Sequence, residues 1–367
     1  MILTGLELEH FRNYSHLAAE FDPRVNLIYG ENAQGKTNLL EAAAYLSLAK
    51  SHRARYDREM IQLDAPEAII RGAVQSRERT FTLEARLIRG RGRQLWSNGV
   101  RLKTAGALAG ILTTVLFCPE DLYLIREGSA ARRRFLDGAI GQLRPRYAQA
   151  LAEYHRLYEH KTRILRDWPE NPSLLATLDD FNLRMAQTGA LVIHYRAHFV
   201  KRLRENAPVI HRDFSGGREE LGLEYTTVST VTDPLESPRL LLPQLLDHQA
   251  RHRQAELDAR QCLSGPHKDD LLVNVNGLAA KTYGSQGQTR TAALSLKLAQ
   301  REIFQEETGE WPVLLLDDVL SELDPKRQAF VLNRIRGGQV FITCCEEDKL
   351  EGLEGGRAFH IRNGTLV

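Results

Sequence analysis

One stretch of eight residues constrains the fold of this chain more than any other feature. Residues 30–37 read GENAQGKT, which matches the whole G-x-x-x-x-G-K-[ST] pattern of a phosphate-binding loop, or P-loop. The glycines let the backbone turn tightly so that its N–H groups point inward, and the helix that follows adds a partial positive charge. The apolar run Val25–Tyr29 before the motif and the helical pattern after Asn38 are the elements that such a loop requires. The sequence therefore predicts a site for the phosphates of a nucleotide.

Two carboxylates far along the chain complement this loop. The run Pro312–Leu316 is apolar and ends in Asp317 and Asp318, as a buried strand does where it reaches the edge of its sheet. Asp317 is expected to hold Mg²⁺ together with the Thr37 hydroxyl, and Asp318 is expected to orient or deprotonate the attacking water. Lys36 is expected to reach the β- and γ-phosphates of ATP and to act in catalysis with Asp318. The residues expected to cradle the nucleotide are Gly30, Glu31, Asn32, Ala33, Gln34, Gly35, Lys36 and Thr37.

A third motif, Ser285-Gln-Gly-Gln288, stands at the head of a predicted helix that runs to about Glu306. In ATP-binding-cassette ATPases, a Ser-x-Gly-Gln signature of one subunit faces the γ-phosphate held by the other subunit. A hydroxyl and a glycine N–H at a helix N-terminus provide such a second anion site. Ser285, Gly287 and Gln288 are therefore candidates for nucleotide contact across a homodimer. The simpler alternative is that Ser285 only caps its helix.

Patterning along the chain predicts an α/β fold. Residues 69–102 alternate and contain the turn Asn98-Gly99, which indicates an antiparallel meander in a mixed sheet. Residues 130–207 are rich in arginine and helical in period, with a loop at Pro169 and Pro172, and a polar helix is expected from about 245 to 260. We expect an ATPase head built from residues 1–118 and 261–367, and an inserted, mostly helical lobe at 119–260.

The composition narrows the classes of protein to which the chain can belong. The chain has 367 residues, and its 49 basic and 47 acidic side chains give a net charge of +2, so a nucleic-acid surface must come from local clusters. The four cysteines form no C-x-x-C pattern, which indicates reduced thiols. The longest uncharged stretch, Thr104–Pro119, is too short to cross a bilayer and is expected to form a helix and a buried strand. We expect a cytoplasmic protein that does not enter a membrane.

Taken together, the motifs resemble those of the RecF family, bacterial recombination mediators with an ATPase head like that of SMC proteins. The resemblance covers nearly the whole chain and includes two distinctive segments, around Arg133 and around Asp317. The segments that carry it are His10–Tyr14, the P-loop, Pro119–Leu122, Arg132–Asp137, Ser264–Asp270, the Ser285 motif and Leu316–Asp324.

The resemblance implies a function. ATP and Mg²⁺ would lie between two subunits and close a dimer on double-stranded or gapped DNA. With RecO and RecR, such a protein brings RecA onto gapped DNA for gap repair, replication restart and SOS induction. Hydrolysis would be weak, DNA-stimulated and used as a timer. Because a short strand brings the N-terminus alongside the P-loop in these heads, Arg12 and Asn13 are expected to contact the phosphates.

Three positions depart from the wider cassette pattern. No Gln lies in the Mg²⁺-sensing loop near Pro119, so Glu120 or Asp121 is the candidate replacement. Thr343-Cys344 stands where many cassette ATPases have a sensor His. Asp318 replaces a Glu, and its shorter side chain fits a weak hydrolase.

Two clusters of arginine are candidates for DNA contact. Residues 126–166 hold ten basic and four acidic side chains, a balance of 10 − 4 = +6. On the second half of the meander, residues 84–103 carry six basic side chains with only Glu84 opposing them. Such clusters suit binding to the DNA backbone, although a solvated helix face is the alternative. The expected contacts are Arg89, Arg91, Arg93, Arg132, Arg133 and Arg134.

Two interpretations remain open beside these. The segment His267–Asp270 is expected to form structural pairs, and a metal site there is the weaker reading because it offers one His and two acids. The nucleotide-binding subunit of a membrane transporter is the alternative function. Such a subunit would normally be shorter, with an LSGGQ signature, a sensor His and no arginine-rich insertion.

Overall fold

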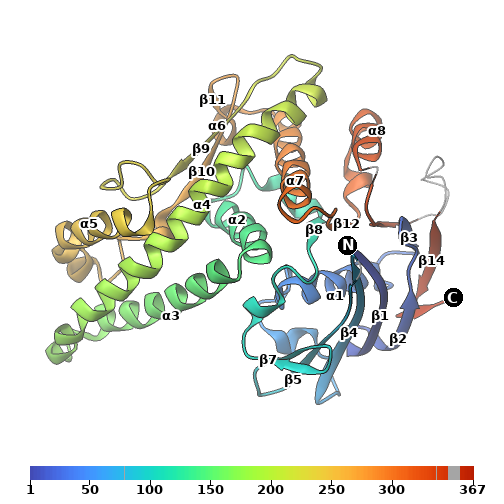
Figure 1. Cartoon of the computed structure of the whole chain (residues 1–367), viewed down its shortest axis with the longest axis horizontal. Coiled ribbons are helices and arrows are strands. Elements are labelled where there is room, and N and C mark those ends of the chain that lie inside the picture. The colour runs from blue at the N-terminus through green and yellow to red at the C-terminus, as the bar shows by residue number, and fades with distance from the viewer. Residues whose placement is uncertain (78, 336, 346–355) are drawn as a thin grey trace. The chain divides into compact units, whose positions relative to one another are not determined.

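The computed structural model describes residues 1–77, 79–335, 337–345 and 356–367. The chain divides into two compact units: unit 1 comprises Met1–Tyr123 and Ala293–Val367, and unit 2 comprises Leu124–Ala292. Both ends of the chain thus belong to unit 1, which is built from its first and last segments (Figure 1).

The first sheet of unit 1 is antiparallel, with strand order β2-β1-β4-β5-β6-β7. The meander predicted from alternation is confirmed. Its last hairpin turns at Asn98 and Gly99, which both have positive φ, +50° and +76°, as the primed two-residue turns require. The strands are β1 (Ile2–Phe11), β2 (Tyr14–Glu20), β4 (Glu67–Ser76), β5 (Arg79–Ile88), β6 (Gln94–Ser97) and β7 (Val100–Leu102).

The second sheet of unit 1 has the order β15-β14-β3-β13-β12-β8. From β14 to β8 neighbouring strands are parallel, and only the edge strand β15 is antiparallel. Because β13 lies between β3 and β12, the carboxyl ends of these three strands meet at one edge of the sheet. The strands are β3 (Val25–Tyr29), β8 (Thr114–Phe117), β12 (Val313–Leu316), β13 (Val340–Cys344), β14 (Arg357–Arg362) and β15 (Thr365–Leu366).

Helix α1 (Lys36–Leu48) and strands from both sheets share one hydrophobic core. Strands β1, β4 and β5 contribute to this core from the first sheet, and β12 and β13 contribute from the second. Leu3, Tyr14, Tyr45, Leu83 and Phe341 are fully buried in it. Burial of so many large apolar side chains fixes the start of α1, and with it the P-loop, relative to both sheets. Unit 1 also holds α8 (Pro325–Arg334) and most of α7 (Gln286–Thr308), and α7 lies close to its predicted range.

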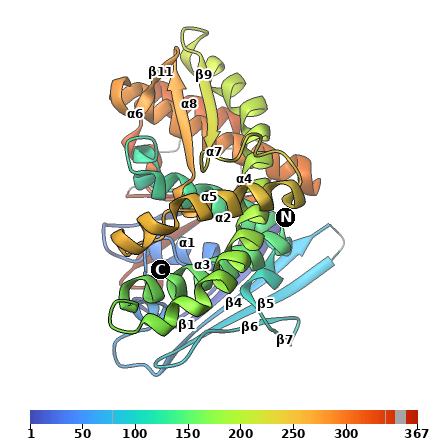
Figure 2. The ribbon, with the colours of Figure 1, turned by 90° about the vertical axis from the view of Figure 1, so that its left-hand side faces the viewer.

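Unit 2 consists of helices around a three-stranded sheet, with order β11-β10-β9. Helix α4 packs against α3, α5 and β9, and Figure 2 shows the three helices beside one another. Its elements are α2 (Ser129–Leu143), α3 (Pro145–Asp167), α4 (Leu178–Ser215), β9 (Leu221–Thr226), α5 (Pro238–Ala259), β10 (Asp270–Val275), β11 (Leu278–Ala279) and α6 (Ala280–Tyr283).

Some helices begin at a proline and therefore start at residues other than those predicted. The first predicted helical stretch is two helices, because Pro145 starts α3 with its fixed φ at the first helical position. Pro238 likewise starts α5 about seven residues before the predicted start at 245. The helix expected near residue 105 is only the short 3₁₀ turn Ala105–Leu108, in a segment that holds Gly106 and Gly110.

The pairing of β10 with β9 draws residues 261–292 into unit 2. The sequence-based division assigned this segment to the head, whereas the two units separate between Ala292 and Ala293, inside α7. None of the helices in the described ranges has the length and hydropathy that a bilayer crossing needs.

Candidate nucleotide site

The P-loop joins β3 to α1, and two of its glycines have positive φ. At Gly30 (φ +147°) a Cβ atom would lie 2.3 Å from the carbonyl oxygen of Ile361. At Gly35 (φ +119°) it would lie 2.7 Å from the amide nitrogen of the Asn13 side chain. Both positions therefore need glycine for the backbone angle and for space.

Lys36 holds the loop in shape from within. Its ammonium donates to the carbonyl oxygens of Gly30 at 2.7 Å and Glu31 at 3.0 Å, and the residue is buried. The amine thus lies inside the turn of the loop, where a cation complements phosphate oxygens. The predicted loop residues Gly30 to Thr37 are brought together as one turn by this arrangement.

Four polar side chains meet where β12 and β13 end beside α1. The Thr37 hydroxyl donates to Oδ1 of Asp317 at 2.9 Å, and the Thr343 hydroxyl lies 3.1 Å from the same oxygen and 3.3 Å from Oδ1 of Asp318. Burial raises the pKa of Asp317 above its ordinary value, although the hydrogen bonds from Thr37 and Thr343 act to lower it. Oxygen ligands of this kind are those that Mg²⁺ prefers, so Thr37 and Asp317 fit the metal role predicted for them.

The turn between β1 and β2 lies against the P-loop. The side-chain amide of Asn13 donates to the carbonyl oxygen of Gln34 at 2.8 Å, and the Tyr14 hydroxyl donates to that of Gly35 at 2.9 Å. Asn13 thereby holds the backbone of the loop. Whether it also contacts phosphate, as expected from the resemblance, stays a prediction.

Arg12 is engaged by a buried carboxylate that the sequence analysis missed. Its guanidinium makes two bonds to Glu41, at 2.9 and 2.8 Å, and a third to the carbonyl oxygen of Glu59 at 2.9 Å. Burial acts to raise the pKa of Glu41, but hydrogen bonds from Arg12 and Ser51 outweigh it, so the pKa lies below its ordinary value. Arg12 therefore links the end of β1 to α1 and to the segment at Glu59, and its contact with phosphate stays a prediction.

A chain of hydrogen bonds continues from this carboxylate back to the P-loop. The Ser51 hydroxyl accepts from the backbone N–H of Arg53, and the Arg53 guanidinium donates to the side chain of Asn38 at 3.0 Å. Asn38 in turn donates to Asn13 at 2.8 Å. Glu41 and Asn38 lie on α1 just after the motif. Their contacts with Arg12 and Asn13 are visible only in the folded structure, so no signal in the sequence points to them.

The two acidic candidates for the missing Gln differ in their surroundings. Asp121 accepts from the backbone N–H of Cys118 at 3.0 Å and forms an ion pair with Lys297 at 2.8 Å. Glu120 is exposed. Asp121 is therefore tied to the start of its turn, and Glu120 has the greater freedom to reach a ligand.

The Ser285 motif forms a capping box at the start of α7. The backbone N–H of Gln288 donates to the Ser285 hydroxyl at 3.2 Å, and the backbone N–H of Ser285 donates to the side chain of Gln288 at 2.9 Å. Ser285 and Gln286 are exposed, whereas Gly287 and Gln288 are half-buried. Ser285 therefore caps its helix, and its hydroxyl keeps its proton for a further bond, so contact with a nucleotide across a dimer stays a prediction.

The three arginines of the helical cluster have different environments. Arg132 is buried and forms a two-pronged pair with Asp270, at 2.7 and 2.8 Å, while its third nitrogen donates to backbone carbonyls. Arg133 is half-buried and donates to the carbonyl oxygen of Asp269 at 2.6 Å. Arg134 is exposed, 3.7 Å from Glu127. Only Arg134 presents its guanidinium openly to solvent, so the run does not form one basic surface.

Most arginines of the meander cluster also have hydrogen-bond or ion-pair partners that the sequence does not indicate. Arg89 donates to the carbonyl oxygens of residues 62, 63 and 65, and Arg93 pairs with Asp57 at 3.1 Å. Arg91 is exposed. Arg86 bonds Glu84 at 2.6 Å, and the same carboxylate also bonds Arg71.

The segment His267–Asp270 forms structural pairs within unit 2. Nε2 of His267 donates to the carbonyl oxygen of Cys262 at 3.0 Å, which leaves Nδ1 to accept from the Tyr154 hydroxyl at 2.7 Å. Burial lowers the pKa of His267 to about 4, so the ring is neutral. The buried Asp269 pairs with Arg196 at 2.8 Å. Within the described parts of the chain, no group of three or more metal-ligating side chains is found.

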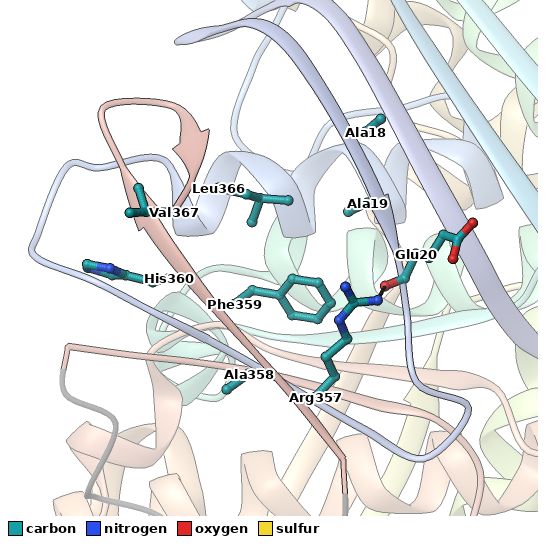
Figure 3. A pocket seen from close by; sticks show the side chains of 9 residues that line it. All are labelled: Ala18, Ala19, Glu20, Arg357, Ala358, Phe359, His360, Leu366 and Val367. Atoms are coloured by element: carbon teal, nitrogen blue, oxygen red, sulfur yellow. Dashed lines mark hydrogen bonds between the residues drawn. The ribbon is translucent and has the colours of Figure 1, made fainter.

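A pocket lies away from these residues, between β2 and the hairpin of β14 and β15 (Figure 3). Arg357 donates to the carbonyl oxygen of Glu20 across it at 2.9 Å, and Phe359 and Leu366 contribute apolar surface. None of the predicted site residues lines it.

The P-loop follows β3 in a mostly parallel sheet, and a carboxylate pair follows β12, with β13 between the two strands. Together with an antiparallel sheet that shares the same core, these features define a P-loop head of the SMC type. The RecF/RecN/SMC N-terminal domain family matches residues 2–363. The chain belongs to this family and, within it, to the RecF proteins, DNA replication and repair proteins, as the following relatives show.

The DNA replication and repair protein RecF of Bacillus subtilis (strain 168) is 40% identical over 371 residues, covering 100% of both chains. That of Agathobacter rectalis is 39% identical over 368 residues, covering 100% of this chain and 99% of the relative. A solved structure of the recombination mediator protein RecF-ATPrS in the RecFOR pathway has a TM-score of 0.92 at 33% identity, covering 99% and 97%. A Smc head domain from Pyrococcus furiosus, at 16% identity and a TM-score of 0.53, shares the fold. The transporter alternative is therefore set aside.

Proposed function

We propose that this protein is an ATP-dependent, DNA-binding recombination mediator that dimerises when it binds ATP. The observation that carries the proposal is the meeting of the P-loop Thr37 with Asp317, with Asp318 beside them, at one sheet edge. The related structures of RecF with ATP and ATPrS support the choice of nucleotide.

The nucleotide would be held by the loop from Gly30 to Thr37, with Lys36 turning its ammonium from the loop carbonyls toward phosphate oxygens. Thr37 and Asp317 would hold Mg²⁺, which supplies positive charge against the phosphates. Asp318 would orient the attacking water. Its short side chain, held by Thr343, is in keeping with weak hydrolysis. The ATPase would serve as a timer and would rise with DNA.

The dimer would complete each site with Ser285 of the second copy. Its exposed hydroxyl already accepts the Gln288 N–H and can still donate a proton to a γ-phosphate oxygen. Gly287 lies at the same helix N-terminus, where anions are favoured. The sandwiched nucleotide would therefore link dimer formation to the presence of a triphosphate.

DNA contact would run through the sugar-phosphate backbone. Of the predicted arginines, Arg89, Arg91, Arg93 and Arg134 are exposed. Arg91 and Arg134 fit this role best, because the partner of Arg134, Glu127, lies 3.7 Å away, while Arg89, Arg93 and Arg133 need to exchange a closer partner. Arg132 supports the fold of unit 2 instead. The protein would bind double-stranded or gapped DNA and work with RecR and RecO to load RecA. It would thereby serve gap repair, replication restart and SOS induction in the cytoplasm.

The test is the oligomeric state under nucleotide control. Sedimentation velocity with ATP, ADP or a non-hydrolysable analogue, with and without gapped duplex DNA, should show dimers with the triphosphates only. Asp318→Asn should keep ATP binding and accumulate dimers, and Ser285→Arg should block dimers while sparing the affinity of the monomer for ATP. A monomer at saturating ATP and Mg²⁺ would refute the proposal.

A further inference from the structure

The Thr343 side chain lies between the carboxylates of Asp317 and Asp318, a position that its neighbours in the sequence do not predict. It lies at the end of β13, the strand between β3 and β12, and is buried. Its hydroxyl accepts the backbone N–H of Asp318 at 2.7 Å and lies within reach of Oδ1 of both Asp317 and Asp318. One side chain thus touches both acidic groups.

The bonding capacity of a hydroxyl limits what this contact can be. A threonine has one proton and two lone pairs, and the Asp318 N–H uses one of the lone pairs. The proton can serve either carboxylate, and the shared oxygen of Asp317 already accepts the Thr37 hydroxyl. Thr343 therefore sets the spacing of Asp317 and Asp318 rather than belonging to one of them.

The backbone of Asp318 gives this contact a second purpose. Its φ of +50° lies in the left-handed region, which costs a non-glycine residue roughly 1–2 kcal/mol. The peptide is clasped on both sides, since its N–H donates to Thr343 and its carbonyl oxygen accepts the Ser321 hydroxyl at 2.6 Å. Without the Thr343 oxygen, the N–H of Asp318 would lose its acceptor and the turn would lose half of the clasp.

We propose that Thr343 is a positioning residue that holds Asp318 in its left-handed turn and directs its carboxylate toward the reacting water. This rests on the proposed hydrolysis of ATP. It assigns to Thr343 a task different from phosphate binding, because the hydroxyl oxygen accepts the Asp318 N–H and its one proton has an aspartate oxygen within reach on either side. The binding of ATP by the P-loop does not depend on it.

Thr343→Val tests the proposal because valine keeps the shape and removes the hydroxyl. We expect kcat to fall about 10- to 100-fold, as misplaced catalytic groups cause. The affinity for a non-hydrolysable ATP analogue should change less than about threefold, within roughly 0.7 kcal/mol. Thr343→Ser should restore most of kcat, and Thr343→Ala should reproduce the split between kcat and affinity if the valine variant does not fold.

Thr114→Val is the matched control. Thr114 is a buried threonine of β8 in the same sheet, and its hydroxyl shares a hydrogen bond of 2.9 Å with Ser47, away from the aspartates. Its loss should leave kcat within about twofold of wild type, less than roughly 0.4 kcal/mol. A similar loss in both variants would mean a general effect of buried hydroxyls and would overturn the assignment.

A double-mutant cycle supplies a readout beyond the single rates. Because Thr343 acts through Asp318, its removal should add nothing to the rate loss of Asp318→Asn. Dimers formed with ATP should persist longer in Thr343→Val than in wild type, by the factor that kcat falls. Additive losses, or an analogue affinity that falls as far as kcat, would overturn the inference. Equal turnover by wild type and Lys36→Met would instead refute the proposed ATPase itself.

Discussion

The hydroxyl of Thr37 donates to Oδ1 of Asp317 across 2.9 Å, although 280 residues separate the two in the chain. The bond links the first turn of α1 to the end of β12 and crosses the carboxyl end of β13 between them. The two side chains predicted to hold Mg²⁺ are therefore already in contact in the protein alone. Binding of ATP would need little rearrangement of these two side chains.

Lys36→Met should weaken ATP binding about 10- to 100-fold, because a bond from a charged donor contributes roughly 1.5–3 kcal/mol. The methionine keeps the length of the buried stem, so the fold should persist. Isothermal titration with a non-hydrolysable analogue measures the loss, and circular dichroism checks the fold. Unchanged affinity would show that the ammonium stays with the carbonyls of Gly30 and Glu31 when nucleotide binds.

Arg132→Ala should destabilise unit 2 by about 2–3 kcal/mol. Loss of one partner from a buried ion pair costs roughly 3–5 kcal/mol, and the side chain of Asp270, 20% exposed, can recover some hydration. Arg134→Ala is the control, since its exposed pair should change stability by less than about 0.5 kcal/mol. Urea unfolding measures both variants. DNA affinity should respond in the opposite order, with the larger loss in Arg134→Ala.

Lys161 and Glu256 form a pair at 2.6 Å whose side chains are 0% and 2% exposed. Lys161→Met should destabilise the protein by about 3–5 kcal/mol, because it leaves a buried carboxylate without its cation. The double variant Lys161→Met with Glu256→Gln should regain much of this stability. The glutamine removes the charge and keeps an oxygen for the backbone N–H of Leu263. A double variant as unstable as the single one would contradict the electrostatic explanation.

His267 predicts a loss of stability in acid. Its pKa is about 4 in the folded state and about 6.5 when unfolded, so the unfolded chain binds the proton more readily between these values. The contribution is fully present above pH 6.5 and is lost as the pH falls to 4, up to about 3 kcal/mol. His267→Gln should remove this pH-dependent part of the free energy of unfolding between pH 6.5 and 4.

Carboxylates titrate over part of the same range, so the comparison of His267→Gln with wild type isolates the histidine. The difference in free energy of unfolding between the two proteins should shrink as the pH is lowered from 7 to 5. Parallel curves over that range would show that the ring is not held neutral by burial between Tyr154 and Cys262.

Local patterns were enough for much of the fold and for the phosphate loop. The P-loop, the strand Val313–Leu316 and the hairpin at Asn98-Gly99 each depend on neighbours in sequence, and all three lie where they were predicted. Helix ends were less accurate where proline could either end or begin a helix, as at Pro145 and Pro238.

The sequence alone determined that this chain has a P-loop followed by a distant carboxylate pair, because glycine spacing and apolar runs act over a few residues. Only the tertiary structure decided which residues surround them. It placed Thr343 between two aspartates, buried Glu41 beneath Arg12, and turned Arg132 from a candidate DNA contact into a partner of Asp270. These contacts join segments 25 to 138 residues apart, and the order of strands and the packing of the core bring them together.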